Sequence, residues 1–428
     1  MSKRYLVRGS AERSPRWVYR AIRAPLLPTA VSAVMLVALV LLLAIGLRGL
    51  PVGRFDGRGP LAWGRFAADE LENNFFNFAL WILWLPSLTI GTAVVGRLWC
   101  GTFCPLRLLA DGARSLGDRV LGRGSTTPYL RLGWVLPVAF VAITFVVKAL
   151  EIQHVARRGA LLFLAIATAA VAVSFFLRRG AWCRFLCPIG GWLARVARLS
   201  VLEIASDHQA CGGCTSRACV REDSPAGRCP SYLNPSKLET MRHCLLCWRC
   251  FGNCPPERDA LFLRVRWPGA ELAEARALDA WEAVFVAGML GMYSAVGHRS
   301  EWLKRLPWAV TFFGLIAGAM LAYVVLSAVA AKLGRVPIRE GLRRFGYTFL
   351  PLELGCAFIA FGDDALEFFG VTAAVARVLL LLGFAWSLAL AVPIVRRATS
   401  TRGYAVLAFS PIAAALAGIT WLWLRWYG

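Results

Sequence analysis

Apolar residues in this chain are grouped in long blocks, rather than at the period of an amphipathic helix or an exposed strand. Seven blocks are long enough to cross a hydrocarbon core of about 30 Å, and each has charged residues at its edges. They cover residues 24–47, 73–96, 132–150, 159–177, 306–331, 378–395 and 403–424. Two weaker segments follow the same pattern: 283–298 is short, and 345–362 contains Glu353. The pattern predicts an all-α polytopic membrane protein with about nine transmembrane helices.

Charge in the loops favours counting both weaker segments as spans. Segment 332–344 holds five basic residues and one acid, whereas segment 363–367 holds three acids and no base. Cytoplasmic loops of membrane proteins are enriched in Lys and Arg, and nine spans place the basic segment inside and the acidic segment outside. We therefore expect the amino terminus to be cytoplasmic. The first block does not resemble a cleaved signal peptide and is predicted to remain as an anchor.

Composition agrees with a membrane protein. Of the 428 residues, 58% are hydrophobic and 17% are charged, which excludes a series of soluble globular domains. The formal charge of +23 arises from 48 Lys and Arg against 25 Asp and Glu. In a soluble protein this excess would suggest a nucleic-acid partner. Here the excess lies in short loops beside the apolar blocks, so no nucleic-acid partner is expected.

Residues 200–275 interrupt the membrane pattern with a polar stretch that carries eight cysteines. About 75 residues cannot bury a large core, so an inorganic group is expected to stabilise this stretch. We therefore predict three parts: a membrane domain of four spans over 1–199, a small cytoplasmic domain over 200–275, and a membrane domain of about five spans over 276–428.

Two cysteine runs in this polar domain have the spacing of iron–sulfur ligands. Cys244-x2-Cys247-x2-Cys250-x3-Cys254-Pro255 matches the bacterial ferredoxin run, whose fourth cysteine binds the neighbouring cluster. The second run is looser, with Cys211-x2-Cys214-x4-Cys219-x9-Cys229-Pro230. The exchange predicts one 4Fe-4S cluster on Cys211, Cys214, Cys219 and Cys254, and a second on Cys244, Cys247, Cys250 and Cys229. The domain is thus predicted to be a ferredoxin-like α+β insert. Two structural zinc sites are the alternative.

A repeated W-C-x3-C-P element supplies four more cysteines. Cys100 and Cys104 follow the second span, and Cys183 and Cys187 follow the fourth, 83 residues later. A spacing of four residues places each pair on one helical face, where two thiols can bind a soft metal such as copper or cycle between dithiol and disulfide. Both pairs are predicted at the cytoplasmic face and could form one four-sulfur site. The alternative is that they are buried small apolar side chains.

Other chemistry has less support. Cys356 lies alone in an apolar segment and is predicted to pack there. Glu353 suggests a proton or ligand path, or else an acid at a helix end. Paired histidines within a span are absent, so no haem is expected. Nucleotide-binding glycine motifs and a serine nucleophile elbow are also absent from the sequence.

Two W-C-x3-C-P elements and a two-cluster insert, together spanning residues 75–262, resemble the NosR/NapH/RdxA group of polyferredoxin membrane proteins. The resemblance implies a bacterial inner-membrane protein with two 4Fe-4S clusters that exchanges electrons with a quinone pool or a cytoplasmic donor. It also implies a redox protein partner, often in the support or assembly of a respiratory metalloenzyme. The flavin domain and flavinylation sequence of the NosR branch are missing, so no flavin is expected. About 150 further residues form additional spans, so the chain is most similar to a NapH-like core with a membrane extension.

These features predict a membrane-bound electron carrier rather than an enzyme with its own substrate. It would pass electrons between a quinol or cytoplasmic donor and a redox partner. A copper reductase or metalloenzyme assembly factor that uses the four C-x3-C thiols is the first alternative. A transporter with a structural metal domain is the second.

Overall fold

The computed structural model describes residues 26–48, 75–122, 134–177, 180–221, 223–255, 260–274, 278–297, 305–368 and 373–426. The chain forms two compact units. The first comprises Met1–Leu39, Thr92–Leu132 and Ala167–Pro268, and the second comprises Val40–Gly91, Gly133–Ile166 and Gly269–Gly428.

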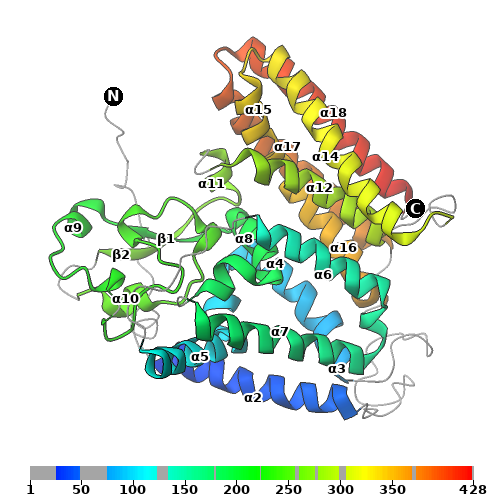
Figure 1. The fold of residues 1–428 in the computed structure, drawn as a ribbon. Coiled ribbons are helices and arrows are strands. Elements are labelled where there is room, and N and C mark those ends of the chain that lie inside the picture. The colour runs from blue at the N-terminus through cyan, green and yellow to red at the C-terminus, as the bar shows by residue number, and fades with distance from the viewer. Residues whose placement is uncertain are drawn as a thin grey trace. The chain divides into compact units, whose positions relative to one another are not determined.

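Within the described residues, eight helical segments are long and apolar enough to cross a membrane. Most are single helices and two are compound. Figure 1 labels the α-helices among them. The single helices are α2 (Leu26–Arg48), α7 (Ala156–Phe176), α12 (Ala280–Gly297), α14 (Trp308–Leu333), α17 (Ala373–Ala398) and α18 (Arg402–Trp426). The compound segments are α3 (Phe75–Asn77) with η1 (Phe78–Trp84) and α4 (Leu85–Val95), and α15 (Ile338–Arg344) with η9 (Phe345–Phe349) and α16 (Leu350–Phe368). The predicted helical membrane architecture is confirmed.

The block predicted to span over 132–150 forms a shorter helix, α6 (Val135–Ala149), of 15 residues. At 1.5 Å per residue this helix is about 22 Å long, less than the thickness of a hydrocarbon core. Glu151 ends it with a left-handed φ of 47° and begins a short 3₁₀ turn, η3 (Ile152–His154). The end of the helix thus agrees with the predicted block to within one residue, and most of the difference in length lies at its start, Val135. Residues 132 and 133 lie outside the described residues.

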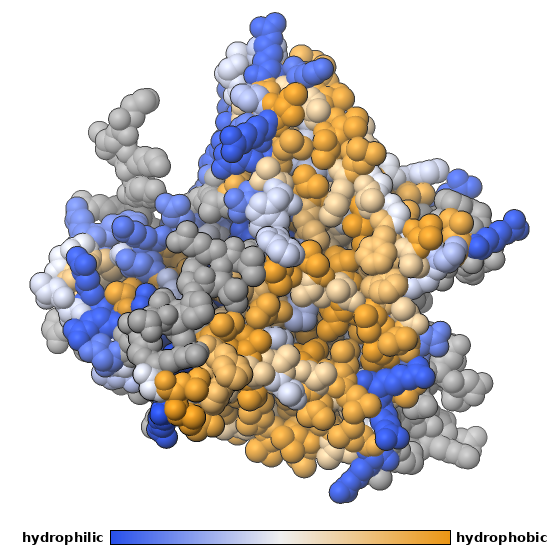
Figure 2. Space-filling model, in the orientation of Figure 1, coloured by the Kyte–Doolittle hydropathy of each residue, from blue (hydrophilic) through white to orange (hydrophobic). Residues whose placement is uncertain are grey.

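In the second unit, α12 packs against α14 and α16, and α18 packs against α14 and α17. Gly291 lets α12 approach α14 closely, because a Cβ atom there would lie 2.1 Å from the carbonyl oxygen of Leu315. The outer faces of these helices expose large apolar side chains, among them Leu321, Leu382 and Val406. Figure 2 shows the corresponding hydrophobic surface over the helices. Such apolar faces are expected against lipid.

Glu353 and Cys356 both lie on α16 and are fully buried. Glu353 is in the first turn of the helix, where the helix dipole favours a negative charge. A role for Glu353 in proton or ligand transfer stays a prediction.

The first unit contains the polar insert. Strands β1 (Leu202–Ser206) and β2 (Leu261–Val265) pair antiparallel, with Leu202 opposite Val265. Between them lie α9 (His208–Gly212), η6 (Ala218–Val220), η7 (Pro235–Lys237), η8 (Met241–His243) and α10 (Arg249–Asn253). Hydrophilic residues predominate on the surface of this insert in Figure 2.

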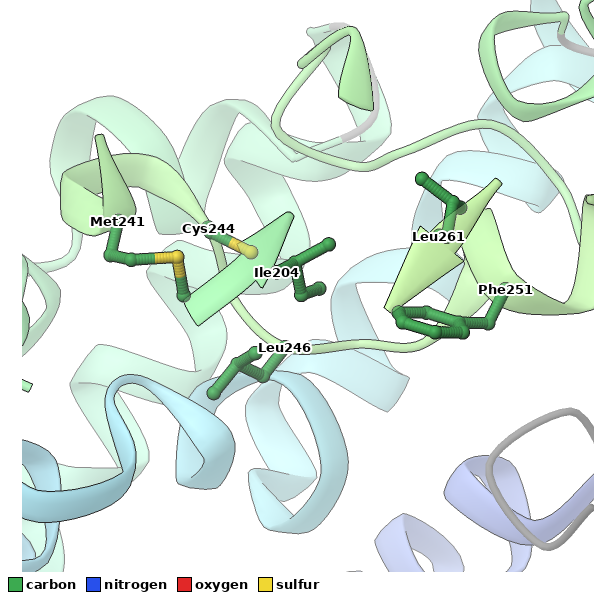
Figure 3. Close-up of a cluster of buried hydrophobic side chains, with 6 residues drawn as sticks. All are labelled: Ile204, Met241, Cys244, Leu246, Phe251 and Leu261. Carbon is green, nitrogen blue, oxygen red and sulfur yellow. The ribbon is translucent and has the colours of Figure 1, made fainter. Parts of the chain in front are cut away.

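A small apolar core holds the insert together, as Figure 3 shows. It consists of Ile204, Met241, Cys244, Leu246, Phe251 and Leu261, all less than 8% exposed. Three of these residues lie between cysteines of the ferredoxin-type run or belong to it. The core and the cysteine run are therefore built from the same segment of chain.

Candidate metal centres

Four cysteines of the insert line an open pocket of about 320 Å³, which we call pocket one. They are Cys211, Cys214, Cys219 and Cys254. Their thiols come from α9, from the loop after it, from η6 and from the end of α10. Exposed Arg217 and Lys237 also line this pocket, at its rim. The structure thus brings together the four cysteines that the spacing assigned to one cluster.

The other four cysteines line a second pocket, which we call pocket two. They are Cys229, Cys244, Cys247 and Cys250, the set assigned to the other cluster. Cys244 and Cys247 are buried, and Cys244 lies in the apolar core of Figure 3. The open space is only about 20 Å³, room for one or two water molecules.

Pro235 lines both pockets. Its ring is buried at the start of η7. A single residue therefore forms a wall common to the two cysteine groups.

Left-handed backbone turns direct the cysteines of pocket two inward. Leu246 and Trp248 flank Cys247 with φ angles of 51° and 61°, and Tyr232 follows Cys229 and Pro230 with a φ of 54°. Residues other than glycine adopt this region at some cost in free energy. The surrounding packing therefore fixes a tightly turned chain around the thiols.

The donor set fits iron–sulfur clusters better than single metal ions. Within the described residues, no group of three or more His, Cys, Asp or Glu side chains is close enough to hold one ion. A cubane binds each thiolate at a different iron, so its ligands are spread more widely than those of one zinc ion. Burial raises the pKa of Cys229 to about 11, and burial also raises the pKa of Cys244 and Cys211. Metal loading must therefore displace thiol protons.

The two W-C-x3-C-P elements have nearly the same backbone. Cys100 lies in a π-helical turn, η2 (Trp99–Phe103), and Cys183 lies in another, η4 (Trp182–Leu186). Cys104 and Cys187 are extended, with φ and ψ of −67° and 116° and of −64° and 113°. Each caps the helix that follows, α5 (Pro105–Leu121) or α8 (Pro188–Val196).

This arrangement differs from the α-helical face expected for a spacing of four residues. The N–H of Cys104 bonds the carbonyl of Trp99 at 2.8 Å, and the N–H of Cys187 bonds that of Trp182 at 2.8 Å. The following proline disfavours α-helical geometry in the residue before it and is itself suited to the first position of a helix. Each second cysteine therefore leaves the helix just where the next helix begins.

The structure brings both C-x3-C pairs together into one group of four thiols. Burial, and then the neighbouring Cys100 and Cys187, raise the pKa of Cys104 to about 12. Burial, and then the other three thiols of this group, raise the pKa of Cys183. We call Cys100, Cys104, Cys183 and Cys187 the four-thiol group.

The first C-x3-C element supports one loop of pocket two. A Cβ atom on Gly101 would lie 1.9 Å from the carbonyl oxygen of Leu245, so only glycine permits this approach. Thr102 Oγ1 donates to the carbonyl of Leu246 at 3.2 Å and accepts from Trp248 Nε1 at 3.1 Å. The first C-x3-C element thus holds the loop that carries Cys247.

The second C-x3-C element supports the loop that carries Cys229. Gly180, with a φ of 77°, lies against the carbonyl of Pro230, where a Cβ atom would be 1.8 Å away. Arg184 donates to the carbonyl of Ser231. The repeated elements therefore hold different loops of the same pocket.

Further contacts fix the insert to α5. Arg249, next to Cys250, forms an ion pair with Asp111 on α5. Arg107 also lies 3.7 Å from Asp111. These partly buried charges connect pocket two to the helix after the first C-x3-C element.

Sequence reasoning missed Arg97 and Pro235. Arg97 is only 1% exposed, and its Nη1 and Nη2 donate to the carbonyls of Arg242 at 3.2 Å and Cys183 at 3.4 Å. An arginine at the end of an apolar span would ordinarily extend toward water, so its position gave no signal of burial. Pro235 lies outside the cysteine runs and has no sequence feature that marks it.

Comparison with known proteins gives one family match. The model of a 4Fe-4S binding domain matches residues 77–124 and 160–202. These segments contain the four-thiol group and none of the eight cysteines of the insert. No solved structure matches the chain.

Curated relatives include proteins named as ferredoxin-type or as electron transport proteins. The chain is 26% identical to the putative electron transport protein YccM of Escherichia coli (strain K12), over 53% of this chain and 68% of that protein. It is 30% identical to the methylamine utilization ferredoxin-type protein MauN of Paracoccus denitrificans (strain Pd 1222), over 36% of this chain and 66% of that protein. It is 25% identical to the ferredoxin-type protein NapH of Haemophilus influenzae, over 46% of this chain and 72% of that protein.

These matches confirm the resemblance to NapH-like polyferredoxins. They support iron–sulfur chemistry and electron transport, with a redox partner of some kind, in a multi-pass membrane protein.

Proposed function

We propose that this NapH-like polyferredoxin passes electrons through two 4Fe-4S clusters held in pockets one and two. The observation that carries the proposal is the sorting of eight cysteines into two groups of four that share Pro235. Each group contains three cysteines of one run and the last cysteine of the other, as in a two-cluster ferredoxin. A bound cubane supplies one-electron redox chemistry at a potential set by burial and by hydrogen bonds to sulfur.

The two pockets suit different steps of the transfer. Pocket one is open and has exposed cations at its rim, so its ligands can exchange electrons with a partner outside the insert. Pocket two has mostly apolar walls and two buried ligands, Cys244 and Cys247, so its thiols are less accessible to water than those of pocket one. The common wall at Pro235 keeps the path between them short.

The location follows from the charge of the loops and from the relatives. We propose a bacterial inner-membrane protein with its amino terminus and the insert, residues 200–275, in the cytoplasm. The membrane domains 1–199 and 276–428 would anchor it. The donor would be a quinol or a cytoplasmic electron carrier, and the acceptor a redox protein.

The alternative function is copper reduction at the four-thiol group, which requires that these thiols bind a copper ion. Two thiols are enough to bind copper(I), so the chemistry of each C-x3-C pair allows this alternative. No group of three or more ligands close enough to hold one ion is found among the described residues, which disfavours one ion shared by both pairs. The carrier function is favoured because it needs only the two sets of four cysteines that line pockets one and two.

The proposal is tested on the full chain, purified anaerobically in detergent. We expect stoichiometric iron and acid-labile sulfide, and an electron paramagnetic resonance signal of reduced 4Fe-4S centres. Replacement of Cys211 and Cys214 by serine should remove one centre, and replacement of Cys247 and Cys250 should remove another. Stoichiometric zinc in place of iron would contradict the proposal.

A further inference from the structure

The two cluster pockets leave the four-thiol group without a function. Its four cysteines come from two repeated elements and are buried or half-buried. Structural packing would not require four thiols to gather, since any small apolar side chain could fill such space. Their arrangement on matching π-helical turns, each followed by Pro at the start of a helix, is that of a built site.

Arg97 lies beside this group and carries a charge that no acid in the described residues balances through an ion pair. Its guanidinium is buried and bonds only neutral carbonyls, and its Nε has no hydrogen-bond partner within the described residues. Gly190 leaves room for it, because a Cβ atom there would lie 3.0 Å from Nη2 and 3.3 Å from the Cys187 Cβ. A buried and uncompensated charge is strongly destabilising. An anionic group held by the thiols would compensate it.

Hydrogen-bond donors around the four thiols also favour negative charge on the sulfur atoms. The N–H of Gly190 donates to Cys187 Sγ at 3.3 Å. Backbone N–H groups of Leu106 and Arg107 lower the pKa of Cys104, against the larger effect of burial. Both sulfur atoms therefore lie at helix N-termini, where the helix dipole stabilises negative charge.

We propose that Cys100, Cys104, Cys183 and Cys187 hold a third iron–sulfur cluster, of the 4Fe-4S type, whose negative charge is balanced by Arg97. The inference rests on the iron–sulfur chemistry of the proposed function. A single zinc ion is disfavoured because no three thiols lie close enough to share one ion among the described residues, whereas a cubane holds its thiolates apart. The match of a 4Fe-4S binding domain to these two segments supports the same cofactor.

The third cluster would lie next to pocket two. Arg97 bonds both Cys183 and Arg242, which is two residues before Cys244. Gly101 and Thr102 contact the loop between Cys244 and Cys247. The three sites would then form a continuous path from the surface of the insert to the ends of the apolar spans.

The first test is the iron content of the full chain after anaerobic purification. Three clusters predict about 12 iron and 12 sulfide per chain, whereas two predict about eight. The double substitution Cys100→Ser with Cys183→Ser should lower iron from about 12 to about eight. The matched control, Cys356→Ser, replaces the one cysteine outside all three groups and should keep about 12.

The outcomes separate this inference from the proposed function. About eight iron in the unsubstituted chain, or unchanged iron in the double variant, overturns the third cluster and leaves the two-cluster carrier intact. A chain without iron overturns both. If the double variant loses all of its iron, the single substitution Cys187→Ser decides. It should convert one centre into a 3Fe-4S cluster with its own paramagnetic resonance signal when oxidised, and absence of that signal overturns the inference.

Discussion

Pockets one and two are built from equal numbers of cysteines, yet they differ in depth. Pocket one offers about 320 Å³ and is bordered by exposed Arg217 and Lys237, whereas pocket two offers about 20 Å³ within the apolar core. The ligands of pocket two also belong to the segment that packs the insert, so its metal chemistry and its folding are coupled. Those of pocket one are all half-buried, and two of them, Cys211 and Cys254, only pack against the edge of that core. The comparison shows that ligand spacing alone does not set the environment of a cluster.

The largest difference between the two pockets should appear in the thermal stability of variants that lack cluster ligands. Replacing Cys244 and Cys247 by serine should remove about four iron atoms and also lower the unfolding temperature, because the new hydroxyls lie in an apolar core at a cost of about 1–3 kcal/mol each. Replacing Cys211 and Cys214 should remove about four iron atoms with a smaller change in unfolding temperature. Iron analysis and thermal unfolding in detergent measure both effects. Equal losses of thermal stability in the two double variants would contradict the comparison.

A side chain on Gly101 should disturb pocket two and leave pocket one unchanged. Gly101→Ala would place a Cβ atom 1.9 Å from the Leu245 carbonyl, and the resulting shift should cost about 1–3 kcal/mol in the free energy of unfolding. The control Gly112→Ala, on α5 with open space around its Cβ position, should be neutral or stabilising by up to about 1 kcal/mol. Thermal unfolding measures stability, and paramagnetic resonance shows which cluster changes. If the signal of the pocket-one cluster changed and that of the pocket-two cluster did not, Gly101 would not support pocket two.

A smaller effect is expected from Thr102→Val. The substitution removes the hydrogen bonds to Leu246 and from Trp248, at a net cost of about 1 kcal/mol each. The pocket-two cluster should become more accessible to oxygen, measured as faster loss of its absorbance in air. Thr89→Val is the matched control, since Thr89 bonds only the carbonyl of Leu85 on its own helical segment. If both variants lost absorbance at the rate of the unsubstituted chain, the hydrogen bonds of Thr102 would not protect the pocket-two cluster from oxygen.

The smallest effect concerns the rim of pocket one. Lys237→Gln should slow reduction by the anionic reductant dithionite by roughly twofold at low ionic strength, and the difference should vanish at high salt. Lys332→Gln, on an exposed lysine of the second unit, serves as control. Stopped-flow absorbance measures the rates. A Lys237 effect that persists in high salt would mean that charge steering is not its cause.

The sequence predicts the helical spans well because apolar blocks of membrane length have few other uses. It predicts the end of the segment that becomes α6 to within one residue, at 150 against Ala149, and begins that segment three residues before Val135. The cysteine partition follows from spacing. The contrast in depth between the two pockets depends on packing by residues such as Ile204 and Leu261, which are 57 positions apart in the chain. Such contacts are invisible to local patterns.

The C-x3-C elements also have features that local sequence patterns do not predict. Their repetition is evident in the sequence, and the prolines after Cys104 and Cys187 indicate that a helix begins there. The assumption of a regular α-helix at a spacing of four residues concealed the π-helical turn. Burial of Arg97 between the two elements depends on tertiary structure, and nothing in its neighbours along the chain predicts it.

Pro235 has one further consequence. Its ring borders both pockets, so two clusters held there would be neighbours on either side of one residue. With a cluster in each pocket, the two clusters together could store two electrons, one on each. Such a store allows a donor that releases electrons in pairs to serve an acceptor that takes them singly.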